Sequence, residues 1–429
     1  MLPENRVQLA CPLFRSYNVA VMAKPQVDVT QLKRRDPAAW TALLQARPQL
    51  QDEVVTAVNA RPLYRGEQTT VTRYQLMLAG HSDPITVISK QTNATEVHFY
   101  KYIAPQLGIQ TPTCWQAAEQ EDGTGWLVLA DVPNHFSPIK WTAVDTEAVI
   151  HRIARQHIQF HNNLDTLHQA GLPPFLDGKK ITRHELQLTH HTYFEEGPAA
   201  NLSDHAIESA GKFAPTLLKA ANGLAVIRTL GGWPGILGES HMAAAADLLD
   251  DPLPMLLPLK DLPATLLHGN QHTHHWRLTL FDDYYLIDWQ KSAVGPGICD
   301  MVNFLEQFDL LYQRDTAFPI LTRTEEERPL SFETMLDTYL LAMHRQLGNA
   351  YDTRQHRQAV PAARCLYVLL NWFPLFADWF TDMPSKYTWQ KINRMSDEQL
   401  AETPFYEYVR FRPFLAGVFG RFLHAYYML

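Results

Sequence analysis

Two segments in the first quarter of the chain have residue patterns that predict β-strands. Thr69–Leu78 is rich in β-branched and aromatic residues, and Ile85–Lys90 alternates between apolar and polar positions. Both patterns are typical of strands that bury one face. The segment between them, Gly80–Pro84, contains a glycine and a proline and predicts a turn. We therefore expect a β-hairpin here, with further strands at Pro112–Ala118 and Gly125–Ala130.

Other segments repeat apolar residues at the spacing of an amphipathic helix. One helix is expected over Thr95–Leu107, between the predicted strands, and another over Val149–His161. Trp40–Leu50 and Asp52–Val58 show the same spacing near the N-terminus, and Asp300–Leu429 predicts mostly helices. The order is a hairpin, a helix, two strands and then a largely helical remainder. This order predicts an α+β fold in which a small β-rich part comes first.

The composition is that of a globular protein with more than one core. The chain has 429 residues, of which 46% are hydrophobic and 19% are charged. A single hydrophobic core usually stops growing near ~250–300 residues, so two lobes are expected. The net charge is −8 and the sequence has no long run of lysine or arginine. These features give no indication of nucleic-acid binding.

The cysteines and the apolar segments indicate in which cellular compartment the protein is expected. Cys11, Cys114, Cys299 and Cys365 are scattered, without a Cys-x-x-Cys pair. This pattern favours free thiols in a reducing cytoplasm. The N-terminal residues lack the basic-then-apolar order of a secretory signal. The very apolar segment Cys365–Phe380 contains polar residues, so we predict a buried helix and no membrane partner.

A histidine-rich segment, Leu267–Trp276, contains the candidate chemistry. It reads Leu-His-Gly-Asn-Gln-His-Thr-His-His-Trp and follows an apolar run, and its glycine allows a tight loop. A predicted strand pair, Leu278–Phe281 and Tyr284–Ile287, comes next and leads to Asp288. Asp288 lies 18 positions beyond Asn270 (288 − 270). A lone aspartate at such a junction is usually a cap or a turn residue, so the specific signal is the whole set in this order.

These residues resemble the catalytic segment of the aminoglycoside phosphotransferase and choline kinase-like superfamily, including its ecdysteroid kinase-like branch. The family pattern is His-Gly-Asp-x-His-x-x-Asn, an apolar strand, and then Ile-Asp-Trp or Ile-Asp-Phe. The resemblance covers roughly residues 63–320 and includes Asp300, which in the family braces the catalytic loop. It implies a bilobal, protein-kinase-like fold. We expect an N-terminal extension over 1–62, an N-lobe over 63–132 and a helical C-lobe over 133–429.

The resemblance also implies ATP and Mg²⁺ as cofactors. It assigns Lys90 to the phosphates of ATP and Glu96, in the following helix, to the orientation of that lysine. The strand that ends just before Asp131 would enter the hinge that binds adenine, and Asp288 matches the magnesium-binding aspartate. Phosphoryl transfer depends on such groups because its transition state is loose and highly charged. Taken alone, Lys90 and Glu96 would more simply be surface residues.

Two positions depart from the family pattern. Asn270 stands where the catalytic aspartate belongs, and an amide cannot accept a proton near neutral pH. His275 stands where a metal-binding asparagine belongs, and imidazole suits zinc, copper, iron or nickel better than magnesium. The family pattern explains His268 and His272 as loop residues; alternatively, one histidine replaces the base, or several bind a transition metal. The catalytic candidates are thus Asn270, His268 and His272, and the metal candidates are Asp288 and His275.

Three functions remain open from the sequence. The chain could be an atypical ATP-dependent phosphotransferase that acts on a small-molecule hydroxyl. It could be a pseudokinase that binds a nucleotide or another ligand and regulates a protein partner, or a kinase-fold enzyme with different chemistry. Glu306, Asp309 and Asp315 follow the metal strand and could attract a cationic acceptor, although such residues more often form a solvated helix face.

Overall fold

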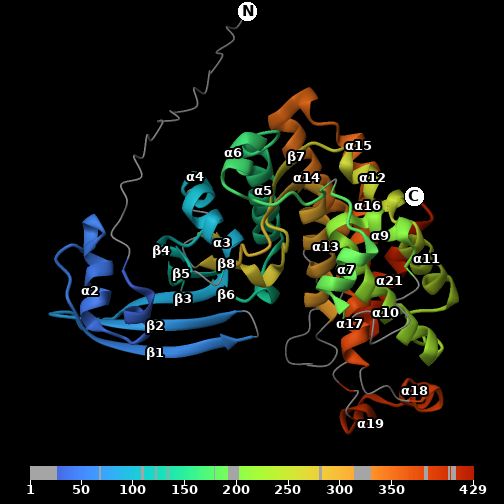
Figure 1. Cartoon of the computed structure of the whole chain (residues 1–429), viewed down its shortest axis with the longest axis horizontal. Coiled ribbons are helices and arrows are strands. Elements are labelled where there is room, and N and C mark those ends of the chain that lie inside the picture. The colour runs from blue at the N-terminus through green and yellow to red at the C-terminus, as the bar shows by residue number, and fades with distance from the viewer. Residues whose placement is uncertain are drawn as a thin grey trace, which may run out of the picture. The chain divides into compact units, whose positions relative to one another are not determined.

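The computed structural model describes residues 27–66, 69–107, 111–120, 123–132, 135–177, 179–191, 202–279, 283–313, 330–380, 385–403, 406 and 412–429. The chain divides into two compact units, Met1–Lys90 and Gln91–Leu429. The first is rich in strands and the second is mainly helical, which confirms the expected α+β class (Figure 1). The boundary between the units falls inside the predicted N-lobe, so the predicted limits of the two lobes stay predictions.

The N-terminal unit is built on a long antiparallel strand pair. Trp40 and Tyr74 are both buried, and their ring centroids lie 4.9 Å apart, so the helix that carries Trp40 packs on this pair. The helix expected over Asp52–Val58 is wrong, because a strand begins at Val55; its β-branched residues favour extended backbone. The elements of the unit are α1 (Val29–Lys33), α2 (Pro37–Gln45), η1 (Pro48–Leu50), β1 (Val55–Arg65), β2 (Thr70–Leu78) and the beginning of β3 (Ile85–Asn93).

The helix expected over Thr95–Leu107 is present but interrupted. It consists of α3 (Ala94–His98), a π-helical turn, η2 (Phe99–Ile103), and α4 (Ala104–Leu107). Pro105 has no backbone N–H to continue the regular helical ladder at this point. The side chains of Phe99, Tyr100 and Ile103 are nevertheless buried, so the apolar face that the sequence predicted is retained.

The strands of the C-terminal unit form short antiparallel groups. β4 pairs with β5, β7 pairs with β10, and β8 pairs with both β6 and β9. The strands predicted near residues 112–118, 125–130 and 284–287 are confirmed with small shifts of their ends. The strand predicted over 278–281 is present up to Thr279, and its last two residues lie outside the described residues. The bounds are β4 (Cys114–Glu119), β5 (Thr124–Ala130), β6 (His135–Phe136), β7 (Ala264–Leu267), β8 (Trp276–Thr279), β9 (Tyr284–Leu286) and β10 (Ala293–Pro296).

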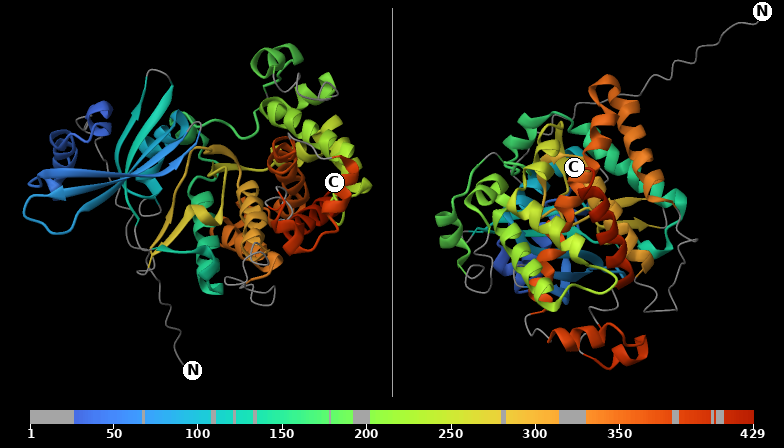
Figure 2. Two further views of the ribbon diagram at one scale, coloured as in Figure 1. Left: turned by 90° about the horizontal axis from the view of Figure 1, so that it is seen from below. Right: turned by 90° about the vertical axis from the view of Figure 1, so that its right-hand side faces the viewer.

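Helices form the bulk of the C-terminal unit. α5 packs against α14, α10 against α17, and α16 against both α13 and α21 (Figure 2). The helices are η4 (Pro138–Lys140), α5 (Ala143–Gln159), α6 (Leu164–Gln169), α7 (Arg183–Thr189), α9 (Asp204–Ala210), η6 (Gly211–Phe213), α10 (Ala214–Leu230), α11 (Glu239–Asp250), α12 (Leu253–Lys260), η7 (Thr273–His275), α13 (Ile298–Gln313), α14 (Phe332–Leu347), η10 (Gly348–Ala350), α15 (Thr353–Gln358), α16 (Val360–Asn371), α17 (Phe373–Trp379), α18 (Lys386–Ile392), α19 (Asp397–Ala401) and α21 (Arg412–Tyr426).

One helical run of the described chain, Thr353–Trp379, is long and apolar enough to cross a membrane. However, 78% of its most apolar window is buried inside the protein. Cys365 and Phe373 are both fully buried. This burial agrees with the core helix that the sequence predicted over Cys365–Phe380.

Candidate functional site

Strand β7 brings the histidine-rich loop out of the core of the C-terminal unit. Leu266 and Leu267 are fully buried, and β7 is held in register by β10, which fixes the point where the loop begins at His268. The chain then passes through η7 and the β8–β9 hairpin to Asp288. The hairpin returns the chain to the loop, so that His275 Nε2 lies 3.2 Å from Asp288 Oδ2.

Asp300 braces the loop from the first turn of α13. The backbone N–H groups of His268 and Gly269 donate to its two carboxylate oxygens at 2.6 and 2.9 Å. His157 Nε2 lies 3.4 Å from the same carboxylate, and His157 Nδ1 lies 2.8 Å from the Tyr339 hydroxyl. Burial raises the pKa of Tyr339 well above its usual value, so its hydroxyl stays protonated. The bracing contact expected for Asp300 is confirmed.

Gly269 lets the loop approach the segment after Asp288 closely. Its φ is +77°, and a Cβ atom at this position would lie 2.0 Å from the carbonyl oxygen of Lys291. The left-handed conformation and the lack of space both require glycine. The glycine that the sequence assigned to a tight loop therefore also sets the distance between the loop and Lys291.

His268 is a buried structural member of the loop. Its Nε2 lies 3.0 Å from the carbonyl oxygen of Ile287, which can only accept, so we place the ring hydrogen on Nε2. Its Nδ1 accepts a hydrogen bond from the backbone N–H of Asn270 at 3.3 Å. Burial lowers the pKa of His268, in agreement with a neutral ring. With both ring nitrogens in use, His268 is poorly suited to receive the proton of an acceptor hydroxyl.

His272 has a comparable arrangement on the more exposed side of the loop. Its Nδ1 accepts the backbone N–H of His274 at 3.0 Å, and the two rings stack with centroids 5.0 Å apart. In the neutral ring the hydrogen is then on Nε2, so the lone pair on Nδ1 is already used. This geometry disfavours His272 as a replacement base.

His275 and Asp288 face each other at the end of the loop. His275 Nδ1 donates to the carbonyl oxygen of Asn270 at 3.0 Å. Burial, reinforced by the neighbouring His268 ring and opposed by Asp288, lowers the pKa of His275 to about 3. In the neutral ring Nε2 carries a lone pair, and it lies 3.2 Å from Asp288 Oδ2. Two acceptors at this distance repel each other unless a cation lies between them.

The separation of these two atoms fits ligands of one divalent cation. Two ligands bound at right angles, each about 2.1 Å from the metal, would lie about 3.0 Å apart, close to the observed 3.2 Å. Asp288 has a φ of +70°, a conformation that is uncommon outside glycine and that aspartate adopts more readily than most residues. No group of three or more His, Cys, Asp or Glu side chains suited to a metal occurs among the described residues, so a site made by the histidines alone is not supported.

Glu96 is fully buried and is tied to the residue that follows Asp288. The backbone N–H of Trp289 donates to Glu96 Oε1 at 3.0 Å, and the Thr92 hydroxyl donates to Glu96 Oε2. The ring of Phe99 stacks on that of Trp289 with centroids 3.8 Å apart. Glu96 therefore positions the Asp288 segment, a role that the sequence did not indicate.

The other predicted site residues belong to different segments of the chain. Lys90 lies in β3 at the end of the N-terminal unit and is buried, and Asp131 directly follows β5 in the C-terminal unit. The predicted contacts of Lys90 and Asp131 with a nucleotide stay predictions. Asn270 is partly buried in the loop, where its carbonyl oxygen and backbone N–H bond to His275 and His268.

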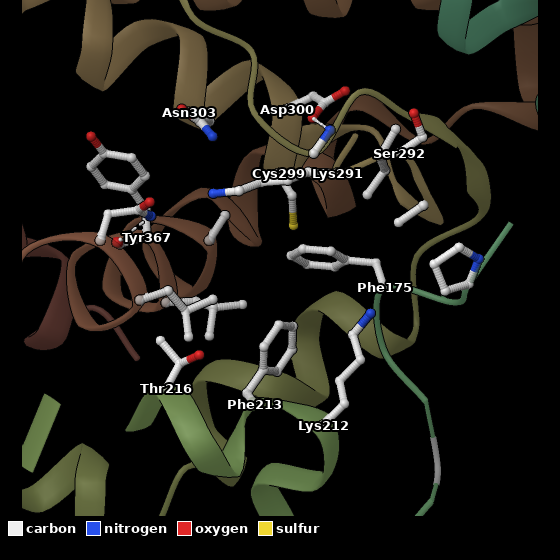
Figure 3. A pocket seen from close by; sticks show the side chains of 18 of the residues that line it. Phe175, Lys212, Phe213, Thr216, Lys291, Ser292, Cys299, Asp300, Asn303 and Tyr367 are labelled. Atoms are coloured by element: carbon white, nitrogen blue, oxygen red, sulfur yellow. Dashed lines mark hydrogen bonds between the residues drawn. The ribbon is translucent and has the colours of Figure 1, made fainter. Parts of the chain in front are cut away.

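A cavity of about 430 Å³ lies in the C-terminal unit beside the loop (Figure 3). Gly269 and Asp300 line it from the loop side, and Lys291 enters it from the segment after Asp288. Lys212 and Phe213 reach it from η6. No sequence pattern pointed to Lys212, whereas Lys291 could have been suspected because it follows Asp288 by three positions.

Glu306, one of the three acidic residues that could attract a cation, is already paired within the protein. Glu306 is fully buried and accepts from Arg364 Nε and Arg421 Nη2, each at 2.7 Å. It is therefore neither part of a solvated helix face nor an unpaired carboxylate, and both expectations are wrong for this residue. The side chains of Asp309 and Asp315 lie outside the described residues.

Comparison with known proteins identifies the family. The sequence model described as the phosphotransferase enzyme family matches residues 67–330, which is more than half of the chain. A search of curated proteins finds no match.

Several solved structures are similar to the chain at low identity. A choline kinase from Cryptosporidium parvum Iowa II is 11% identical, with 87% of this chain and 99% of that chain covered and a TM-score of 0.41. An ethanolamine kinase from Plasmodium vivax is 12% identical, with coverage of 84% and 82% and a TM-score of 0.42. Amicoumacin kinase hAmiN, in complex with AMP-PNP, Ca²⁺ and Ami, is 12% identical, with coverage of 91% and 96% and a TM-score of 0.41.

Proposed function

Because the chain belongs to the phosphotransferase enzyme family, we propose that it transfers a phosphoryl group from ATP to a hydroxyl group of a small molecule. One observation carries the proposal. The imidazole of His275 and the carboxylate of Asp288 converge at 3.2 Å, next to the loop that contains Asn270. The buried carboxylates of Glu96 and Asp300 hold the two sides of this arrangement through backbone N–H groups.

Each residue has a defined part in the proposed reaction. A divalent cation held by Asp288 and His275 would neutralise charge on the transferred phosphoryl group. Lys90 would contact the phosphates of ATP. The amide of Asn270 can donate to or accept from the acceptor hydroxyl, but it cannot take its proton. Transfer would then depend on positioning and electrostatics, at a cost of about 10²–10⁴-fold relative to an enzyme with a general base.

The proposal is tested by the thermal stability of the protein. ATP with a divalent cation should raise the melting temperature, because a ligand that binds only the folded state stabilises it. Asp288→Ala should abolish this shift. Asp283→Ala is the matched control, since Asp283 lies in the β8–β9 turn and should leave the shift unchanged. A wild-type protein that no nucleotide stabilises would overturn the proposal.

A second function is favoured by Asn270. A pseudokinase would bind the nucleotide through the same residues but would not turn it over, and it would act on a protein partner. The hydrogen bonds of His268 and His272 support this function. The Nδ1 atom of each ring already accepts a backbone N–H, so neither ring is suited to replace the catalytic base. The two functions differ in turnover: a nucleotide-dependent melting shift without phosphoryl transfer to any small hydroxyl compound would favour the pseudokinase.

A further inference from the structure

The cavity beside the loop has an unusual charge for a site expected to accept a cation. Of the described residues that line it, Lys212 and Lys291 are basic and Asp300 alone is acidic. Both oxygens of Asp300 accept backbone N–H groups of the loop, and its carboxylate also faces His157. The one carboxylate among the described lining residues is thus engaged by the protein, whereas two ammonium groups border the open volume.

Lys212 is held in a setting that an anion would stabilise. Its Nζ donates to the carbonyl oxygen of Pro174 and lies 5.6 Å from the ring centroids of both Phe175 and Phe213. An ammonium has three N–H groups, and one carbonyl satisfies only one of them. Burial lowers the pKa of Lys212, and the Asp177 carboxylate opposes this shift. A bound anion would offer acceptors to the N–H groups that the Pro174 carbonyl leaves over.

The other lining groups complete a site for a compact organic molecule. Phe175 and Phe213 meet edge to face, with centroids 5.3 Å apart, and provide an apolar wall. Thr216 and Asn303 also line the cavity, and the Asn303 side-chain oxygen is buried with no partner among the described residues. Figure 3 shows these side chains around one space, with the two lysines entering from different segments. The volume of about 430 Å³ is typical of a small-molecule site.

A second cavity extends the basic surroundings of Lys212. It has a volume of about 210 Å³ and shares Lys212 and Phe213 with the first cavity. Lys179, Lys180 and Lys260 also line it, together with Asp177 and Glu208, and Lys180 pairs with Glu208 at 3.1 Å. Lysines therefore outnumber acids here as well, which favours an anion over a cation at Lys212.

We infer that this cavity binds an acceptor that carries an anionic group, a carboxylate or a phosphate, held between Lys212 and Lys291. The role as acceptor rests on the proposed phosphotransferase function, because Gly269 and Lys291 place the cavity against the catalytic loop. The preference for an anion rests on the charges alone. This preference is the opposite of the cationic acceptor that the sequence suggested.

The preference is tested with two probes that share a hydroxyphenyl ring. 3-(4-Hydroxyphenyl)propionate carries a carboxylate, and tyramine carries an ammonium group. Binding of each to the full chain is measured by isothermal titration calorimetry without nucleotide or metal. A failure here is therefore separate from a failure of the nucleotide test. We expect the carboxylate probe to bind, and its affinity to fall as salt is added. Tyramine should bind at least tenfold more weakly.

Variants locate the site. Lys212→Gln and Lys291→Gln should each weaken the binding of the carboxylate probe by about tenfold, since each removes a charged donor. Lys219→Gln in α10, which removes a lysine paired with Asp378 outside the cavity, should have no effect. Circular dichroism tests whether each variant is folded. If a variant does not fold, the salt dependence of probe binding to the wild type still tests the preference for an anion. Tighter binding of tyramine, no binding of either probe, or carboxylate binding indifferent to both lysine variants would overturn the inference.

Discussion

Glu96 Oε1 accepts the backbone N–H of Trp289 at 3.0 Å, and this bond joins α3 to the residue that follows Asp288. The contact lies within the C-terminal unit and needs no lysine. The family pattern associates this carboxylate with the orientation of Lys90, which stays a prediction, whereas its bond to Trp289 is observed. It fixes the backbone from which Asp288 projects.

Glu96→Ala should therefore lower the free energy of unfolding and weaken the binding of metal-bound ATP. Each buried donor left without an acceptor costs about 1–3 kcal/mol, and the donors here are the Trp289 N–H and the Thr92 hydroxyl. Glu96→Gln retains an acceptor for Trp289 and should cost less. Urea denaturation measures both, with Glu119→Gln on β4 as a surface control. Equal stability of all three variants would exclude this bracing role.

Gly269 and Gly80 form a matched pair for testing the loop. Both have positive φ, +77° and +80°, but a Cβ atom at Gly80 would meet nothing within 4 Å, whereas one at Gly269 would lie 2.0 Å from the Lys291 carbonyl oxygen. Gly80→Ala should cost about 1–2 kcal/mol from the backbone conformation alone. Gly269→Ala should cost clearly more and should also displace the loop. Similar melting temperatures for the two variants would contradict the close approach.

His275 should affect which divalent cation the site at Asp288 binds most tightly. Imidazole is a softer ligand than the amide oxygen that the family pattern places here, so the site should prefer Mn²⁺ to Mg²⁺. His275→Asn should reduce this preference. Electron paramagnetic resonance of Mn²⁺, titrated with Mg²⁺ as competitor, measures the selectivity directly and needs no turnover. If Mg²⁺ displaces Mn²⁺ equally well from the wild type and the variant, His275 is not a ligand.

Asn270→Asp should supply the missing base. If the remainder of the site is competent, phosphoryl transfer or ATP hydrolysis should rise by about 10²-fold, toward the lower end of what a general base contributes. Combining Asn270→Asp with Asp288→Ala should remove the gain, because the metal ligand is then lost. An unchanged rate in Asn270→Asp would show that more than the base is altered and would favour the pseudokinase.

Acid should destabilise the protein partly through His356. This ring is buried, stacks on Tyr351 and donates from Nδ1 to the Asp352 carbonyl oxygen at 2.7 Å; burial lowers its pKa below 6.5. The folded state then binds the proton less readily than the unfolded state. Its contribution is full above pH 6.5 and is lost as the pH falls toward the lower folded pKa. His356→Phe should make the stability curve flatter below pH 6.5, while His184→Phe, at an exposed position, should not.

Local patterns in the sequence determined the elements and the family. The alternation over Thr69–Leu78 and the helical spacing over Val149–His161 gave elements close to the observed β2 and α5, because burial of one face imposes the period. The order of the histidine-rich loop, the apolar strand pair and Asp288 pointed to the phosphotransferase family. The sequence failed at Asp52–Val58, where β-branched residues outweighed an apparent helical spacing.

Only the tertiary structure decided what the candidate residues contact. It joined Glu96 to Trp289, across 193 positions, and paired Glu306 with Arg364 and Arg421. It also placed Lys212 and Lys291 at one cavity. Such relationships depend on which elements pack together, and neither residue type nor local spacing encodes that choice. The sequence therefore supplied the groups on which the proposed phosphoryl transfer depends, whereas packing determined which of them converge and which charges line the cavity.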